Sequence, residues 1–117
     1  MKKALWLSRH ELTSDQLTDI EKKLGDKVEV VMENITWQAT EDDAADYAAN
    51  FATWRRLVLK FSPDAVLGVF PPVALESVPF GLEIFSPISR QNATLRADGT
   101  KQIVFEHVRW SRNLNMR

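Results

Sequence analysis

The sequence contains no cysteine, and only four glycines and five prolines occur among its 117 residues. The lack of cysteine excludes a disulfide scaffold and a cysteine zinc site. Four scattered glycines cannot build a phosphate-binding glycine loop, and neither G-x-G-x-x-G nor a P-loop is present. With only two histidines, His10 and His107, we expect no metal and no cofactor. A chain of this size is expected to form one domain around a single core.

Long apolar runs are also missing. The first run, residues 4–7, stops at Ser8-Arg9-His10, which is too short for the apolar segment of a signal peptide or for a membrane span. We therefore expect a cytoplasmic protein without a membrane partner.

The charge is nearly balanced overall, with 15 basic and 16 acidic residues. This balance argues against a nucleic-acid partner, because such proteins carry a clear positive excess. The two parts of the chain differ, however: 9 basic and 14 acidic residues precede Ser89, and 6 basic and 2 acidic residues follow it. The basic end is a solvated face, a footprint for a phosphate-rich ligand, or a surface that pairs with the acidic part of another copy.

Two long helices are predicted. The first begins with a capping box, Thr13-Ser14-Asp15-Gln16, and ends at Gly25. The second is expected to be capped by Thr40 and to stop before Pro63. Its expected core stripe is Ala44, Ala48, Phe51, Arg55 and Val58, flanked by Tyr47, Trp54 and Leu57.

Apolar runs at 3–7, 28–32, 65–70 and 82–85 predict strands, the last interrupted at Pro87, with a short helix at 73–78. An Asp-Gly turn within 97–100 predicts a hairpin whose second strand covers 102–110. This order predicts an α/β fold: a small Rossmann-like parallel sheet of flavodoxin-like order 2-1-3-4, with helices on both faces and a C-terminal antiparallel hairpin. The single domain, 1–117, then consists of a βα body, 1–87, and a hairpin with its tail, 88–117.

Ligands of such sheets bind at the carboxyl ends of the strands, beside the point where the strand order reverses. The candidate ligand-binding residues there are Ser8, Arg9, His10, Phe70 and Pro71. Arg9 could clamp a phosphate, Ser8 could donate to a phosphate oxygen, and His10 is the candidate catalytic proton carrier. Alternatively, Ser8 and His10 satisfy backbone groups at the strand end and Arg9 pairs with a carboxylate.

The C-terminal strand interleaves aromatic and basic residues. Strict alternation places Phe105, His107 and Arg109 on one face and Glu106, Val108 and Trp110 on the other. Candidate interface residues are Trp110, Arg109 and Arg112, because Trp and Arg are enriched in interfaces. Trp110 could instead pack in the core, and aromatics beside arginines could also stack on bases.

The stretch from Leu7 to Gln16, LSRHELTSDQ, resembles the start of small CRISPR-associated Rossmann-fold proteins related to CARF domains and compact ring nucleases. The resemblance implies a homodimer that binds a cyclic oligoadenylate across its two-fold axis, with or without slow cleavage. Ser8, Arg9 and His10 would face that ligand. A second ligand-binding motif and an effector nuclease domain, found in larger CARF proteins, have no match in this sequence.

Two functions follow from the sequence. The first is a homodimeric binding protein for a nucleotide or other phosphorylated ligand, with metal-independent cleavage as a subsidiary possibility in which His10 assists proton transfer. The alternative is a non-enzymatic, homo-oligomeric interaction protein of a phage, mobile element or CRISPR locus, whose basic hairpin mediates association.

Overall fold

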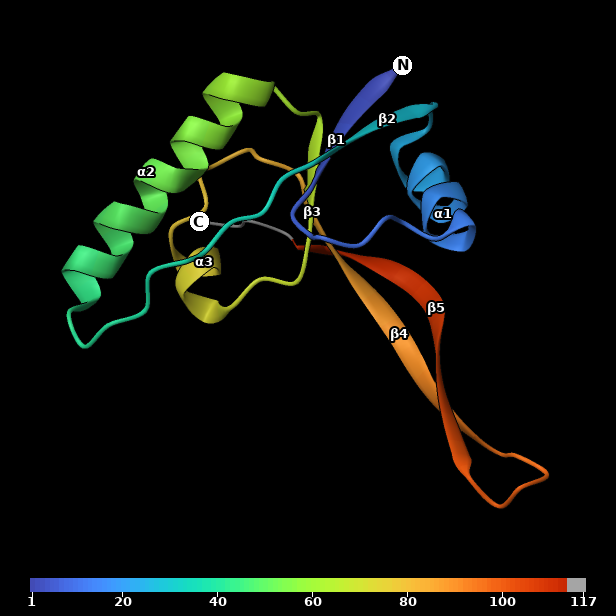
Figure 1. Ribbon diagram of the computed structural model, residues 1–117. Helices are drawn as coiled ribbons and strands as arrows, with labels where there is room; N and C mark the ends of the chain where they lie inside the picture. The colour runs from blue at the N-terminus through green and yellow to red at the C-terminus, as the bar shows by residue number, and fades with distance from the viewer. Residues whose placement is uncertain (114–117) are drawn as a thin grey trace.

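Five strands form one sheet in the computed structural model, which describes residues 1–113 (Figure 1). The strands are β1 (Lys2–Trp6), β2 (Val28–Met32), β3 (Ala65–Leu67), β4 (Ile84–Leu95) and β5 (Lys101–Asn113). Their order is β2-β1-β3-β4-β5; the first four are parallel, and β5 is antiparallel to β4. The α/β class, the 2-1-3-4 order and the C-terminal hairpin are therefore confirmed. Residues 114–117 of the expected tail lie outside the described residues.

Helices cover both faces of the sheet (Figure 1). One face carries α1 (Ser14–Leu24), and the other carries α2 (Asp43–Phe61) and the short α3 (Pro72–Glu76). The start of α1 is as predicted: the Thr13 hydroxyl accepts from Gln16 N at 3.2 Å, and the Gln16 side chain accepts from Thr13 N at 3.0 Å. Gly25 ends the helix with a φ of 72°.

The core consists of two apolar layers, because successive side chains of a buried strand point to opposite faces. In β1, Trp6 packs toward α1 and Leu5 packs toward α2. The layer under α1 contains Ala4, Trp6, Ile20, Ala65, Leu67, Phe85 and Trp110; the layer under α2 contains Leu5, Trp54, Leu57, Val66, Ala74, Val78 and Ile84.

The predicted core stripe of α2 is wrong, although its flanking residues Trp54 and Leu57 are buried. The helix buries Asp46, Asn50, Trp54 and Leu57, a stripe with helical spacing. The predicted stripe is turned outward: its first four residues are exposed and its last, Val58, is half-buried. The predicted cap is also wrong, since Asp42 rather than Thr40 accepts from the first turn, from Ala45 N at 3.1 Å.

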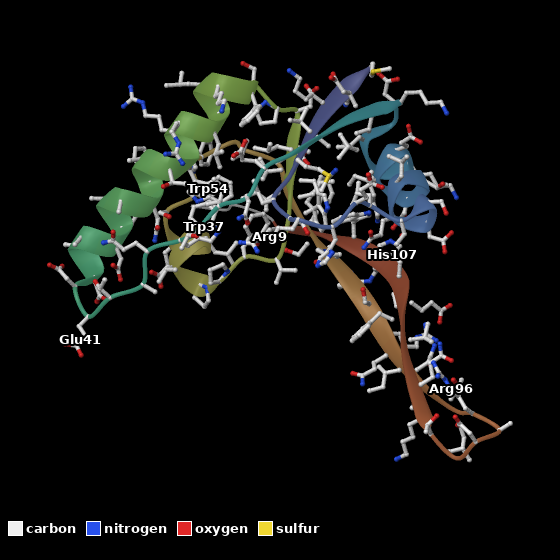
Figure 2. All side chains as sticks on the ribbon, in the orientation of Figure 1. Arg9, Trp37, Glu41, Trp54, Arg96 and His107 are labelled. Carbon is white, nitrogen blue, oxygen red and sulfur yellow. The ribbon has the colours of Figure 1, made fainter. Side chains whose placement is uncertain are left out.

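The cause is a segment that we call the strap, residues 33–42, which leads from β2 into α2 and lies against it. Trp37 of the strap packs on Trp54, with 4.8 Å between ring centroids (Figure 2). The Asn50 side-chain amide accepts from Gln38 N at 2.8 Å and donates to the Gln38 carbonyl at 2.9 Å. It therefore bonds both backbone groups of Gln38, as a residue of a neighbouring strand would. Polar residues of α2 thus face inward because the strap satisfies them.

Thr40 and Gln38 of the strap both bind the second inward polar residue, Asp46, and the Gln38 amide donates to its carboxylate at 3.2 Å. Thr40 makes the two shorter bonds. Its N–H and its hydroxyl donate to the Asp46 carboxylate at 2.7 and 2.8 Å. These two bonds lower the pKa of Asp46, although burial acts in the opposite direction. Since the folded-state pKa of Asp46 is depressed, its ionised carboxylate stabilises the fold at pH values above the unfolded-state pKa. This stabilisation is lost as the pH falls through the folded-state pKa.

Beyond the body, β4 and β5 continue as a two-stranded projection, which we call the arm, residues 89–107 (Figure 1). Residues 89–106 are all exposed. The predicted interruption at Pro87 is wrong, because β4 runs through it. Pairing between β3 and β4 ends at Phe85, so Pro87 lies where the outer edge of β4 is open and a missing N–H is tolerated.

The observed face of α2 predicts how two aromatic residues of one helix respond to truncation. Trp54→Ala should lower the free energy of unfolding by about 3–5 kcal/mol, because it empties a fully buried site and leaves the Ala74 carbonyl without the indole donor at 2.9 Å. Phe51→Ala, on the outward face, should cost about 1 kcal/mol or less. Urea unfolding followed by circular dichroism measures both; equal losses would contradict the observed face.

Candidate functional site

The turn after β1 is held by the Ser8 hydroxyl and by the indole of Trp6. The Ser8 hydroxyl accepts from His10 N at 3.1 Å, and the His10 carbonyl accepts from Trp6 Nε1 at 2.5 Å. The Ser8 side chain thus satisfies a backbone group at the strand end, as in the alternative interpretation of this turn. His10 takes part through its backbone. The imidazole of His10 remains exposed.

Arg9 is oriented by Asn34, which lies in the strap just after β2. With its amide oxygen turned toward the guanidinium, Asn34 accepts from Nε and Nη2 of Arg9, each at 3.2 Å. The partner is thus a neutral amide rather than the carboxylate of the alternative interpretation. Among residues 1–113, no ion pair neutralises Arg9, and its side chain lies exposed at the carboxyl edge of the sheet (Figure 2).

The second predicted segment, after β3, lies at the same edge. Phe70 folds back onto the body: its ring packs 5.5 Å from Trp54 and would be 3.1 Å from a Cβ at Gly68. Only glycine therefore fits position 68 without displacing this ring. Pro71 precedes α3 as its N-cap and is exposed. Phe70 has a packing role, which leaves Arg9, His10 and Pro71 as the exposed members of the predicted set.

The base of the arm is fixed by Trp110, which is 1% exposed. Its ring meets Trp6 edge-on, with centroids 5.7 Å apart, and its Nε1 donates to the Gln16 carbonyl at 2.9 Å. Within one copy of the chain Trp110 is therefore a core residue. The two other predicted interface residues, Arg109 and Arg112, are exposed, and Arg112 Nε lies 3.3 Å from the Glu83 carboxylate.

Asp19 of α1 completes the attachment. One of its oxygens lies 3.1 Å from His107 Nε2 and accepts from Trp110 N at 3.2 Å. The predicted alternation of the strand is wrong here, because a bulge between Ile88 and Ser89 leaves Val108 without a partner on β4. The extra residue puts His107 and Trp110 on the same face, toward α1. We call Asp19, His107, Trp110 and Gln16 the clamp. It could not be predicted from the sequence, since a bulge leaves no signature in the pattern of residue types.

A cleft of about 350 Å³ opens between the start of α1 and the arm. It is lined by Thr13, Asp15, Gln16, Ser89, Asn92 and residues 104–107. Its charged side chains are the carboxylates Asp15 and Glu106, and no lysine or arginine lines it. The N-terminal backbone of α1 is already capped, so this cleft does not suit a phosphate.

The arm itself is amphipathic. Gln91 pairs with Phe105, Ala93 with Ile103 and Leu95 with Lys101, and these pairs share the face that carries His107. The exposed fractions of Leu95, Ile103 and Phe105 are 74%, 55% and 71%. We call Ala93, Leu95, Ile103 and Phe105 the apolar face of the arm. It continues the α1 side of the sheet beyond the N-terminal start of α1, so no helix covers it (Figure 1).

The clamp predicts that the Asp19 carboxylate stabilises the folded protein. Asp19→Ala should lower the free energy of unfolding by about 1–3 kcal/mol, because Trp110 N and His107 Nε2 would both lose their acceptor. The matched control is Thr18→Ala, an exposed neighbour in the same helix, for which a change below about 0.5 kcal/mol is expected. Urea unfolding measures both, and an unchanged Asp19→Ala would show that the clamp does not hold the arm.

Comparisons with known proteins identify no relative of this chain: no protein-family model, no curated protein and no solved structure matches it. The predicted resemblance to CARF-like proteins therefore stays a prediction. Within residues 1–113, no helix is long and apolar enough to cross a membrane, and no cluster of metal-ligating side chains is found.

Proposed function

We propose that the chain is a non-enzymatic interaction protein that associates with a second copy of itself through the arm. The observation that carries this proposal is the uncovered apolar face of the arm, which has no helix over it in a protein whose body sheet is covered on both faces.

The energetics of a two-stranded projection support a partner. An isolated hairpin in water is at best marginally stable, and sheets acquire stability by burying one face. Burying a leucine, isoleucine or phenylalanine side chain contributes about 1.5–3 kcal/mol. Leu95, Ile103 and Phe105 make little of this contribution within one copy, because each is more than half exposed. A partner that covers the apolar face would recover it.

The opposite face of the arm explains why association would be one-sided. Arg90 lies opposite Glu106 in the register of the two strands, and the Asn92 amide donates to Glu106 at 3.0 Å. Thr94 and Gln102 continue this polar face toward the turn. Val104 is its one large apolar residue. A polar face remains in water while the apolar face contacts the partner.

Two adjacent substitutions on β5 test the proposal. Phe105→Asp places a charge in the apolar face and should convert the associated protein to a monomer. Val104→Asp adds the same charge one residue away on the opposite face and should leave association unchanged. Both side chains are exposed, so neither substitution disturbs the core.

Sedimentation equilibrium at tens of micromolar measures the association of each variant. Two outcomes would overturn the proposal: a monomeric wild-type protein, or equal effects of the two substitutions. Circular dichroism of the variants confirms that the body is folded.

A second candidate function rests on Arg9. We propose that the turn at Ser8, Arg9 and His10 binds a phosphorylated ligand such as a nucleotide or a cyclic oligoadenylate. The supporting observation is an exposed guanidinium, oriented by Asn34 and free of a carboxylate partner within the described residues, at the edge where α/β sheets bind ligands. The exposed imidazole of His10 would serve in proton transfer if the ligand is also cleaved.

Thermal shift with mononucleotides and cyclic oligoadenylates tests this second candidate. A ligand at 100 times its Kd should stabilise the fold by about 2.7 kcal/mol, and Arg9→Ala should remove that stabilisation. Arg55→Ala, an exposed arginine on α2, is the control and should retain it. If no compound raises the Tm, or if both variants respond like the wild type, the candidate is refuted.

A further inference from the structure

The outer face of α2 is a second uncovered apolar surface. Tyr47 and Phe51, 47% and 38% exposed, stack with an interplanar angle of 8° and centroids 6.2 Å apart. Exposed alanines surround them and allow another chain to approach closely: Ala44, Ala45, Ala48 and Ala52. The opposite face of α2 is packed in the core. A helix that is apolar on two faces is typical of one that is covered on both.

The charges beside this outer face indicate which surface covers it. Its N-terminal end carries Glu41, Asp42 and Asp43, all exposed. The arm carries Arg90, Arg96 and Lys101 against Asp98 and Glu106. Contact of arm with arm would bring together two surfaces that each carry a net charge of +1, three basic minus two acidic residues. Contact of an arm with the start of α2 would instead bring this net positive surface to three carboxylates.

One chain cannot make this contact with itself. The arm and α2 diverge from the sheet, and Arg96 near the tip of the arm lies far from Glu41 (Figures 1 and 2). Their sizes nonetheless match: seven residue pairs of the arm span about 23 Å at about 3.3 Å per residue, and the 19 residues of α2 span about 28 Å at 1.5 Å each. Two copies related by a two-fold axis could each offer an arm and accept one.

We infer that the apolar face of the arm packs on the outer face of α2 of a second copy, in a reciprocal exchange. The inference rests on the proposed function and adds the surface that receives the arm. Ile103 and Phe105 of one copy lie against Tyr47 and Phe51 of the other, and basic residues of the arm lie near the acidic start of that helix.

The absence of cysteine makes a cross-linking test clean. Two exposed alanines are replaced in separate, differently tagged copies: Ala93→Cys on the apolar face of the arm and Ala48→Cys on α2. The copies are mixed, allowed to exchange and treated with a short bismaleimide. The expected product is a heterodimer that carries both tags. The matched controls are Thr94→Cys, on the opposite face of the arm, and Lys23→Cys, exposed on α1. Thr94→Cys is mixed with Ala48→Cys, and Lys23→Cys is mixed with Ala93→Cys.

A charge exchange gives an independent readout. Arg96→Glu and Glu41→Arg should each weaken self-association, by about threefold to tenfold, and the double variant should restore it. Lys23→Glu, a charge reversal away from both surfaces, should leave the Kd unchanged.

The outcomes separate this inference from the proposed function. A monomeric wild-type protein overturns both. Association that Phe105→Asp abolishes, combined with no preference for the Ala93 and Ala48 pair and no restoration in the charge exchange, overturns the α2 surface and leaves arm-mediated association standing. Preferential cross-linking together with restoration supports the reciprocal exchange.

Discussion

The burial of Trp110 between the sheet and α1 is the contact on which the rest of the arrangement depends. Its indole N–H is bonded to α1, its backbone N–H is bonded to Asp19, and its ring meets Trp6. The indole N–H of Trp6 then donates to the His10 carbonyl, in the loop that also carries Arg9. One side chain from the end of the chain thus joins the first helix, the first strand and the candidate ligand turn. Because β5 is fixed there, its preceding residues can leave the body as an arm.

The direction in which the arm leaves follows from the parallel sheet. β4 runs in the same direction as β1 and β3, so its continuation passes the carboxyl edge of the sheet. That edge also carries the turn after β1. Association through the arm would therefore place a second copy on the side of the sheet that carries Arg9 and His10, and the two candidate functions are compatible in one dimer. A ligand bound at this edge would meet residues of both copies only if the partner reaches the turn, which is a stronger requirement than dimerisation alone.

The parts of the fold that local chemistry determines were predicted well. The capping box at Thr13 and the glycine at 25 act within a few residues, and both were found where they were expected. Strand order followed from right-handed crossovers and short apolar runs. The clamp could not be predicted, because it depends on one unpaired residue, Val108, that reverses the alternation after it. Of the candidate site, sequence placed the turn at the sheet edge, but the packing of Phe70 on Gly68 is a contact that only the folded chain reveals.

The wrong face of α2 has a physical explanation that bears on its partner. Asp46 and Asn50 are polar, so periodicity assigned them to water, yet the strap satisfies both and they turn inward. The apolar stripe with Phe51 is then left outside. A partner-free chain could lower its exposed apolar area with polar residues on that stripe, at no cost to the core beneath. The stripe carries aromatic residues instead, as is expected of a surface that another molecule buries. The same reasoning applies to Ile103 and Phe105, which are both more than half exposed on the arm.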